Sequence, residues 1–220
     1  MSKDIVLHST EKLDIKFPEP SDIDKKRSLK SQDLIKKTSI YNESGKTFIN
    51  KNSIPHLLGT DKKGVNKIYN NADNEDKIEN GNNKYLSTSA TKKEISKRIE
   101  EPRDTLEREH LKDTEKNLIA LRDFPDLEKL REIKESKIRK ELPKVKEKKR
   151  KLEKEDYVTG ELLTKPEVHH IERVADNPNK ALDEDNLVVV NQDTHKEIHK
   201  EGAESKEKLE EFKKNWNKNK

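Results

Sequence analysis

The segment EVHHIERVADNPNKALDEDNLVVVNQDTHKEIH, residues 167–199, holds four of the seven histidines of a 220-residue chain without cysteine. Its hydropathy pattern predicts a strand over 168–174, then a loop rich in Pro, Asn and Asp, and a second, compact strand over 186–190. A helix should follow, with Asp193 or Thr194 near its N-cap. We therefore expect the order strand, loop, strand and helix, with histidines on the first strand and on the helix.

The spacing of these histidines indicates a metal site. On a helix, His195 and His199 leave the same face one turn apart and can share one ion. His169 from the strand would complete a three-histidine set with an open position, as a catalytic site requires. Imidazole ligands suit Zn and Ni, and Mg or Mn can serve in catalysis, so we expect one divalent ion (Mg, Mn, Ni or Zn).

In order and spacing, the pair His169-His170, the central Asn186 and the HxxxH at 195–199 resemble the HNH endonucleases, in the variant found in colicin nucleases. The resemblance covers about 45 of the 220 residues. It implies a ββα-metal finger that hydrolyses phosphodiester bonds, with His170 as general base and Asn186 as the residue that supports it. The CxxC pairs of many HNH modules are missing, so the finger must be held by its metal, by the preceding helices or by a partner.

Other residues of the segment suit supporting roles. Glu167 lies two residues before His169 on the same face of the predicted strand, so it can orient a histidine ligand. Arg173, Lys180 and Lys196 are candidates for contacts with phosphate groups.

The composition limits how much of the chain can fold around a core, because 28% of the residues are hydrophobic and 43% are charged. We expect small folded modules separated by exposed helix or disordered segments. Residues 1–45 show neither a helical nor a strand period and are predicted to be largely disordered, with at most one short helix around SQDLIKK, residues 31–37. The HNH module is placed at 155–202, and a charged helical tail at 203–220.

Residues 46–89 predict a helix, a turn, a second helix that begins after Thr60 or Asp61, and a hairpin at Asn80-Gly81. This order resembles small winged helix-turn-helix domains. The resemblance implies DNA contacts from the second helix and from the wing. Those residues are Asp61, Lys62, Lys63 and Lys67 on the helix, and Asn82, Asn83 and Lys84 on the wing. The alternative is a small α+β module without DNA contact.

Residues 90–154 predict a charged helical linker, interrupted at Pro102, Pro125 and Pro143. Apolar residues repeat at seven-residue intervals and favour helix pairing. They are Leu111 and Leu118, followed by Ile138, Val145 and Leu152. Residues 137–154 contain ten Lys or Arg and only three Glu. This excess of positive charge indicates either a phosphate-binding stripe or a solvated helical face.

Together these patterns predict a mainly α fold with a small α+β HNH finger at the C-terminus and a possible winged helix-turn-helix near the N-terminus. The predicted function is a metal-dependent endonuclease acting on DNA, with RNA as an open alternative. A rival hypothesis is a DNA-binding regulator that uses residues 46–89 and keeps the finger as a structural metal module. A protein inhibitor or partner could bind the central helices. No membrane association is expected, and the predicted location is cytoplasmic unless export proceeds without an N-terminal signal.

Overall fold

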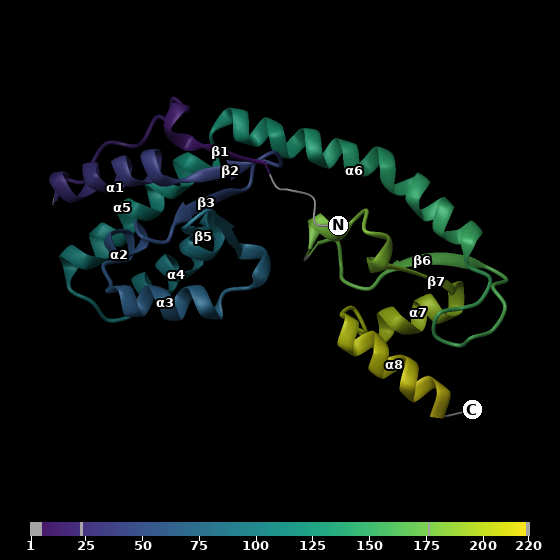
Figure 1. The fold of residues 1–220 in the computed structure, drawn as a ribbon. Helices are drawn as coiled ribbons and strands as arrows, with labels where there is room; N and C mark the ends of the chain where they lie inside the picture. The colour runs from purple at the N-terminus through teal and green to yellow at the C-terminus, as the bar shows by residue number, and fades with distance from the viewer. Residues whose placement is uncertain (1–5, 23, 176, 219–220) are drawn as a thin grey trace. The chain divides into compact units, whose positions relative to one another are not determined.

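The computed structural model describes residues 6–22, 24–175 and 177–218, and the chain divides into two units, Met1–Ile133 and Lys134–Lys220 (Figure 1). The fold is mixed α and β. The described residues form eight α-helices, one antiparallel sheet of five strands and another of two. Among the described helices, none combines the length and the apolar character that a membrane crossing requires.

Unit 1 is built on the five-stranded sheet, in the order β1-β2-β3-β5-β4, with every neighbouring pair antiparallel. Its strands are β1 (Leu7–Ser9), β2 (Ile40–Asn42), β3 (Thr47–Asn50), β4 (Lys77–Asn80) and β5 (Asn83–Ser87). Asn80 pairs with Asn83 across a two-residue turn, and Gly81 has a φ of 56°, which favours glycine. The hairpin predicted at Asn80-Gly81 is therefore confirmed.

The helices of unit 1 are α1 (Lys25–Thr38), α2 (Ile54–Leu58), α3 (Lys62–Asn71), α4 (Thr88–Glu100), α5 (Thr105–Arg122) and the start of α6 (Pro125–Leu152). Four of them begin at a polar side chain that caps the helix. Asp24, Asp61, Ser87 and Asp104 each accept a hydrogen bond from a backbone N–H in the first turn of α1, α3, α4 and α5. Short 3-10 helices occur at Thr10–Lys12, Asn74–Asp76, Pro178–Lys180 and Glu184–Asn186.

The prediction that residues 1–45 are largely disordered was wrong for the described part of this segment. Ile35 of α1 is fully buried, and the hydroxyl of Thr10 donates to the carbonyl of Ser39 at 2.9 Å. Helix α1 also buries Ser28, whose hydroxyl donates to Asp113 of α5 at 2.8 Å. Hydropathy patterns treat such small polar residues as exposed, so they missed the inner face of this helix.

Residues 90–154 do not form a linker throughout, because α4 and α5 belong to the core of unit 1. Ile95, Leu111 and Leu118 are fully buried together with residues of β3, β5 and α2. The seven-residue repeat of Leu111 and Leu118 therefore packs inside this unit and is not available for a partner protein. Pro102 separates α4 from α5, whereas α6 continues through Pro143.

The helix, turn, helix and hairpin predicted for 46–89 are present as α2, a turn at Gly59, α3 and β4–β5. Gly59 has a φ of 56° and ends α2. Asp61 is the N-cap of α3, as one of the two predicted positions, and its carboxylate accepts from Gly64 N at 2.7 Å. The hairpin is the edge of the larger sheet, so these elements fold as part of unit 1 and not as a separate module.

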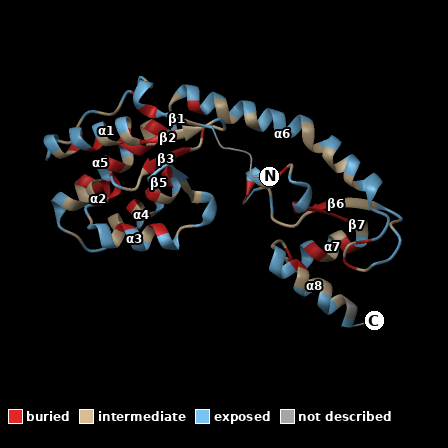
Figure 2. Cartoon of the chain, in the orientation of Figure 1, coloured by how far each residue is buried: buried red, intermediate tan, exposed pale blue. Residues whose placement is uncertain are grey.

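Unit 2 consists of the remainder of α6, the hairpin β6 (Pro166–His170) and β7 (Leu187–Asn191), and helices α7 (Gln192–Lys200) and α8 (Lys206–Lys218). Both faces of the hairpin are covered. Val188 and Val190 pack with Ile198 of α7, whereas Leu187 and Val189 pack with Val145 of α6. Most of α6 is exposed or half-buried (Figure 2).

The segment 203–220 was predicted to be a charged helical tail. Its described part does form a helix, α8, but this helix packs on unit 2. Leu209 is buried, Phe212 and Trp216 pack against the same apolar cluster, and Tyr157 Oη donates to Glu210 at 2.5 Å. An apolar face of only three residues in a helix rich in lysine and glutamate was therefore enough to dock it.

Candidate metal centre

Three histidines meet where β6 faces α7. One ring nitrogen from each of His169, His195 and His199 lies within 4.8 Å of the others. The Nε2 atoms of His195 and His199 are 3.2 Å apart, as expected for residues one helical turn apart. His169 pairs with Val188 in the hairpin, which places it on the face that packs against α7.

The chemistry of these side chains fits a metal ion. The side chain of His169 is buried, and its Nε2 atom has no hydrogen-bond partner among the described residues. Burial, reinforced by the neighbouring His195 and His199, lowers the pKa of His169 to about 4. Neutral imidazole is the form that binds metals. A bound ion would also give the buried Nε2 atom of His169 the partner that it otherwise lacks.

Two carboxylates form hydrogen bonds with the Nδ1 atoms of His195 and His199, on the ring edge that points away from the cluster. Glu167 Oε2 lies 2.5 Å from His195 Nδ1, and Glu204 Oε1 lies 3.0 Å from His199 Nδ1. An ionised carboxylate accepts a hydrogen bond from Nδ1–H, so the proton stays on Nδ1 and each imidazole keeps its Nε2 lone pair for the centre of the cluster. The hydrogen bond from His199 lowers the pKa of Glu204, and Arg173 contributes to this shift, which keeps the carboxylate ionised.

Glu204 was not identified from the sequence. It follows the turn that ends α7, where Gly202 has a φ of 61° and reverses the chain direction. The sequence signal that could have identified it is a carboxylate five residues after the HxxxH motif and two residues after a glycine. The arrangement is reached only when the turn brings Glu204 back toward His199.

His170 is the last residue of β6 and pairs with Leu187, so it lies on the opposite face of the hairpin from His169. Its Nε2 atom is 3.1 Å from the carbonyl oxygen of Ala181. A carbonyl only accepts, so Nε2 must donate, which leaves Nδ1 as a proton acceptor in the neutral ring. Burial lowers the pKa of His170, against the opposing effect of the Ala181 hydrogen bond, and Lys146 of α6 lowers it further.

Asn186 is buried and ties down the loop between β6 and β7. Its Nδ2 donates to the carbonyls of Glu172 at 3.1 Å and Lys180 at 3.2 Å, and its Oδ1 accepts from Glu172 N at 2.8 Å. The carbonyl that orients His170 belongs to Ala181, the residue after Lys180. Asn186 therefore fixes the loop segment that positions the His170 ring.

The cationic residues of unit 2 that were predicted to contact phosphate each pair with a carboxylate. Arg173 Nη1 lies 3.2 Å from Glu204 Oε2, so it adjoins the carboxylate behind His199. Lys180 pairs with Glu172, and Lys196 pairs with Asp193 at 3.2 Å. The remaining candidates, Lys62, Lys63 and Lys67, lie on α3 in unit 1.

Comparison of the chain with protein-family models, with curated proteins and with solved structures finds no match.

Proposed function

We propose that unit 2 is an HNH-type ββα-metal nuclease module and that the protein hydrolyses phosphodiester bonds in DNA. One observation carries this proposal. The end of β6 separates two neighbouring histidines, so that His169 joins a three-histidine cluster while His170 is held as a neutral base by a backbone carbonyl. A purely structural metal site requires the three-histidine cluster but does not require an oriented histidine beside it.

The proposed roles follow from the contacts. His169, His195 and His199 would hold one divalent ion, and Zn and Ni suit imidazole ligands best, with Mg and Mn as the other candidates. Such an ion polarises the phosphate and stabilises the leaving oxygen when it is bound. His170 accepts a proton from the attacking water at Nδ1. Asn186 acts through the loop, as a positioning residue, and Glu167 and Glu204 fix the tautomers of the helical histidines.

The charge of α6 supports a polyanionic substrate. Ten Lys or Arg residues occur between positions 137 and 154, against three Glu, and most of this part of the helix is exposed. Contacts of this kind supply affinity that does not depend on sequence and that decreases with salt. They favour nucleic acid over a small phosphodiester as the substrate. Because they act on any phosphate backbone, the preference for DNA over RNA needs a separate test with both polymers.

The test is cleavage of supercoiled plasmid by the purified full chain with Mg, Mn, Ni or Zn, and with EDTA. Nicking should disappear in EDTA and in His195→Ala, because the metal is lost. His170→Ala should bind the ion as tightly as the wild type but cleave about 100- to 10,000-fold more slowly. His8→Ala, which removes an exposed histidine of unit 1, is the matched control and should cleave normally. Structured RNA of equal length, assayed in parallel, identifies the preferred polymer.

A second candidate function is a DNA-binding regulator that uses α2, α3 and the β4–β5 hairpin. It is favoured by the composition of α3, whose sequence KKGVNKIYNN contains lysine and asparagine on its exposed positions and no acidic residue. If the wild-type protein cleaves with none of the metals but retains DNA binding in EDTA, the regulator is the better description and the histidine cluster is structural.

A further inference from the structure

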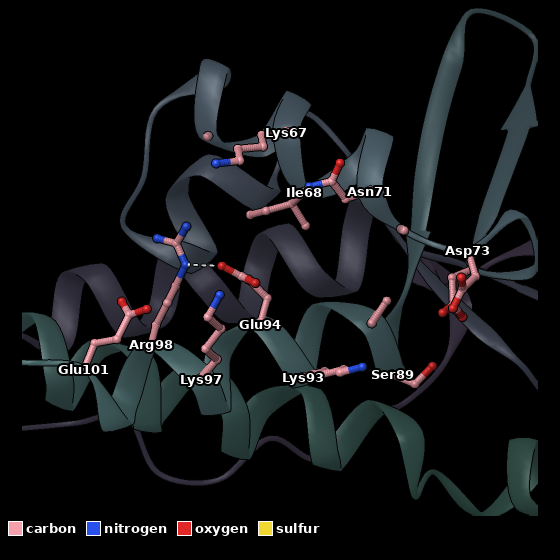
Figure 3. A pocket seen from close by; sticks show the side chains of 14 residues that line it. Lys67, Ile68, Asn71, Asp73, Ser89, Lys93, Glu94, Lys97, Arg98 and Glu101 are labelled. Atoms are coloured by element: carbon pink, nitrogen blue, oxygen red, sulfur yellow. Dashed lines mark hydrogen bonds and ion pairs between the residues drawn. The ribbon is translucent and has the colours of Figure 1, made fainter.

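A groove in unit 1 separates α3 from α4 and has a volume of about 700 Å³ (Figure 3). Its walls carry charged side chains of both helices, and its apolar lining comes from Ile68, Ala72 and Ala90. Cavities of this size are typical of binding sites, and a lining with both apolar and cationic groups suits a ligand that has both kinds of surface.

Three lysines line this groove from both walls. Lys67 comes from α3, and Lys93 and Lys97, four residues apart, come from α4. All three are exposed, and none of them forms an ion pair with a described residue. Figure 3 shows Lys67 across the groove from the α4 side chains, with Lys97 extending toward α3. Three ammonium groups around one groove form a positively charged surface, which favours the binding of an anion.

The acidic residues of the groove offset these lysines only in part. Glu94 is neutralised by Arg98 at 2.8 Å, and Glu101 by Arg103 at 2.7 Å. Asp76 accepts from Lys46 at 3.2 Å and from the hydroxyl of Ser87 at 2.6 Å.

Asp73 is the remaining carboxylate that lines the groove, and it forms no ion pair with a described residue. It follows the C-terminal end of α3, and Figure 3 shows it away from Lys67 and Lys97. The part of the groove that Lys67 and Lys97 border therefore has a positive excess.

We propose that the groove between α3 and α4 binds the sugar-phosphate backbone of duplex DNA, with Lys67, Lys93 and Lys97 contacting phosphates. The apolar lining provided by Ile68 and Ala90 suits deoxyribose. The identity of the polymer as DNA rests on the proposed function, whereas the groove and its charge do not. This surface uses α4, which the sequence had placed in a linker, and it assigns unit 1 a role in holding the substrate.

The test measures binding of a fluorescent 20-base-pair duplex by the full-length chain that carries His170→Ala, so that cleavage does not interfere and the metal ligands stay intact. The groove variant combines Lys67→Gln, Lys93→Gln and Lys97→Gln. The matched control combines Lys25→Gln, Lys26→Gln and Lys30→Gln on α1, which removes the same charge from exposed positions on the opposite side of unit 1 (Figure 1).

Loss of three phosphate contacts should weaken binding at least about 10-fold at moderate salt and reduce the slope of log K against log salt by about 2 to 3. The control should change affinity by less than about twofold, because screened charges at a distance contribute little. Asp73→Asn, which removes a negative charge from the far part of the same groove, should strengthen binding slightly. Circular dichroism should show that all variants fold, since every substituted lysine is exposed.

The proposal is overturned if the groove variant and the control bind alike, or if the salt slope does not change. Tighter binding of an RNA duplex that depends on the same lysines overturns the assignment to DNA. Binding of a polyglutamate peptide, and not of nucleic acid, by the groove would point to an acidic protein partner and also overturn it. Failure of wild-type cleavage alone, with lysine-dependent DNA binding retained, refutes the nuclease and leaves the groove assignment standing.

Discussion

The two units of this protein stabilise their folds in different ways. The largest apolar cluster of unit 1 contains 14 buried residues, drawn from its helices, from the sheet and from the segment that follows β1. In unit 2 the hairpin divides the apolar residues into clusters of six and of three, and the space beside β6 holds three histidines instead. Unit 1 therefore rests on one large apolar core supplemented by buried hydrogen bonds, whereas unit 2 places three histidines that could bind a metal where a small domain would otherwise have core.

The largest difference between the units should appear on metal removal. A site that binds its ion only when folded gains RT ln(1 + [L]/Kd), which is about 4 kcal/mol at a thousandfold excess over Kd. Zn should therefore raise the hydrogen-exchange protection of β6, β7 and α7 by this order, and EDTA should reverse it. Protection of β3 and β5 should not change. An equal response of both units, or none in unit 2, would show that the histidines do not form the stabilising site.

The converse experiment is Leu118→Ala. Leu118 is fully buried in the cluster of unit 1, so its truncation should cost about 2 to 5 kcal/mol of the free energy of unfolding of that unit. Metal binding by unit 2 should be retained. Urea unfolding followed by hydrogen exchange, with Leu106→Ala at an exposed position of α5 as the control, separates the two effects. Loss of metal binding in Leu118→Ala would contradict the independence of the units.

When no metal is present, acid should destabilise both units through their buried histidines. The pKa of His169 is lowered to about 4, so the unfolded chain takes up a proton below pH 6.5 that the folded unit resists. The stability of unit 2 should then fall as the pH decreases from about 6.5 to about 4, by up to roughly 3 kcal/mol. Burial also lowers the pKa of His56 and His110, so unit 1 should lose stability in the same direction.

The control for this pH dependence is His169→Leu. It should remove most of the acid sensitivity of metal-free unit 2 and leave that of unit 1 unchanged, as measured by urea unfolding at pH 7.5 and pH 4.5. If unit 2 of this variant is as acid-sensitive as the wild type, another group carries the effect.

The smallest expected effect is on metal affinity, when the carboxylate that accepts from Nδ1 of His199 is replaced. Glu204→Gln should reduce metal affinity about 10- to 100-fold, because the amide holds the Nδ1 proton of His199 less firmly than a carboxylate does. Glu201→Gln, at an exposed position next to the same turn, should have no effect. Calorimetric titration with Zn measures both, and equal affinities would show that Glu204 does not position His199.

Parts of the fold could be predicted because their signals are local. The order of strand, loop, strand and helix in unit 2 was readable from hydropathy, and the hairpin at Gly81 from a two-residue turn. The predictions for residues 1–45 and 90–154 were wrong because parts of these segments are buried by contacts between residues that are far apart in the sequence. Ser28 and Asp113 are 85 residues apart and pair only in the folded unit. No periodicity of either segment records such a contact, so burial of the first helix was not visible.

The sequence by itself determined the candidate ligands of the metal site. An HxxxH motif places two imidazoles on one face of any helix, and alternation along a strand sends His169 and His170 to opposite faces, whatever surrounds them. Only the tertiary structure decided what each ring contacts. Glu204 reaches His199 because a turn reverses the chain, the Ala181 carbonyl reaches His170 because Asn186 closes the loop, and the lysine groove exists because α3 and α4 face one another. Local geometry follows from neighbouring residues, whereas these contacts depend on how distant segments pack.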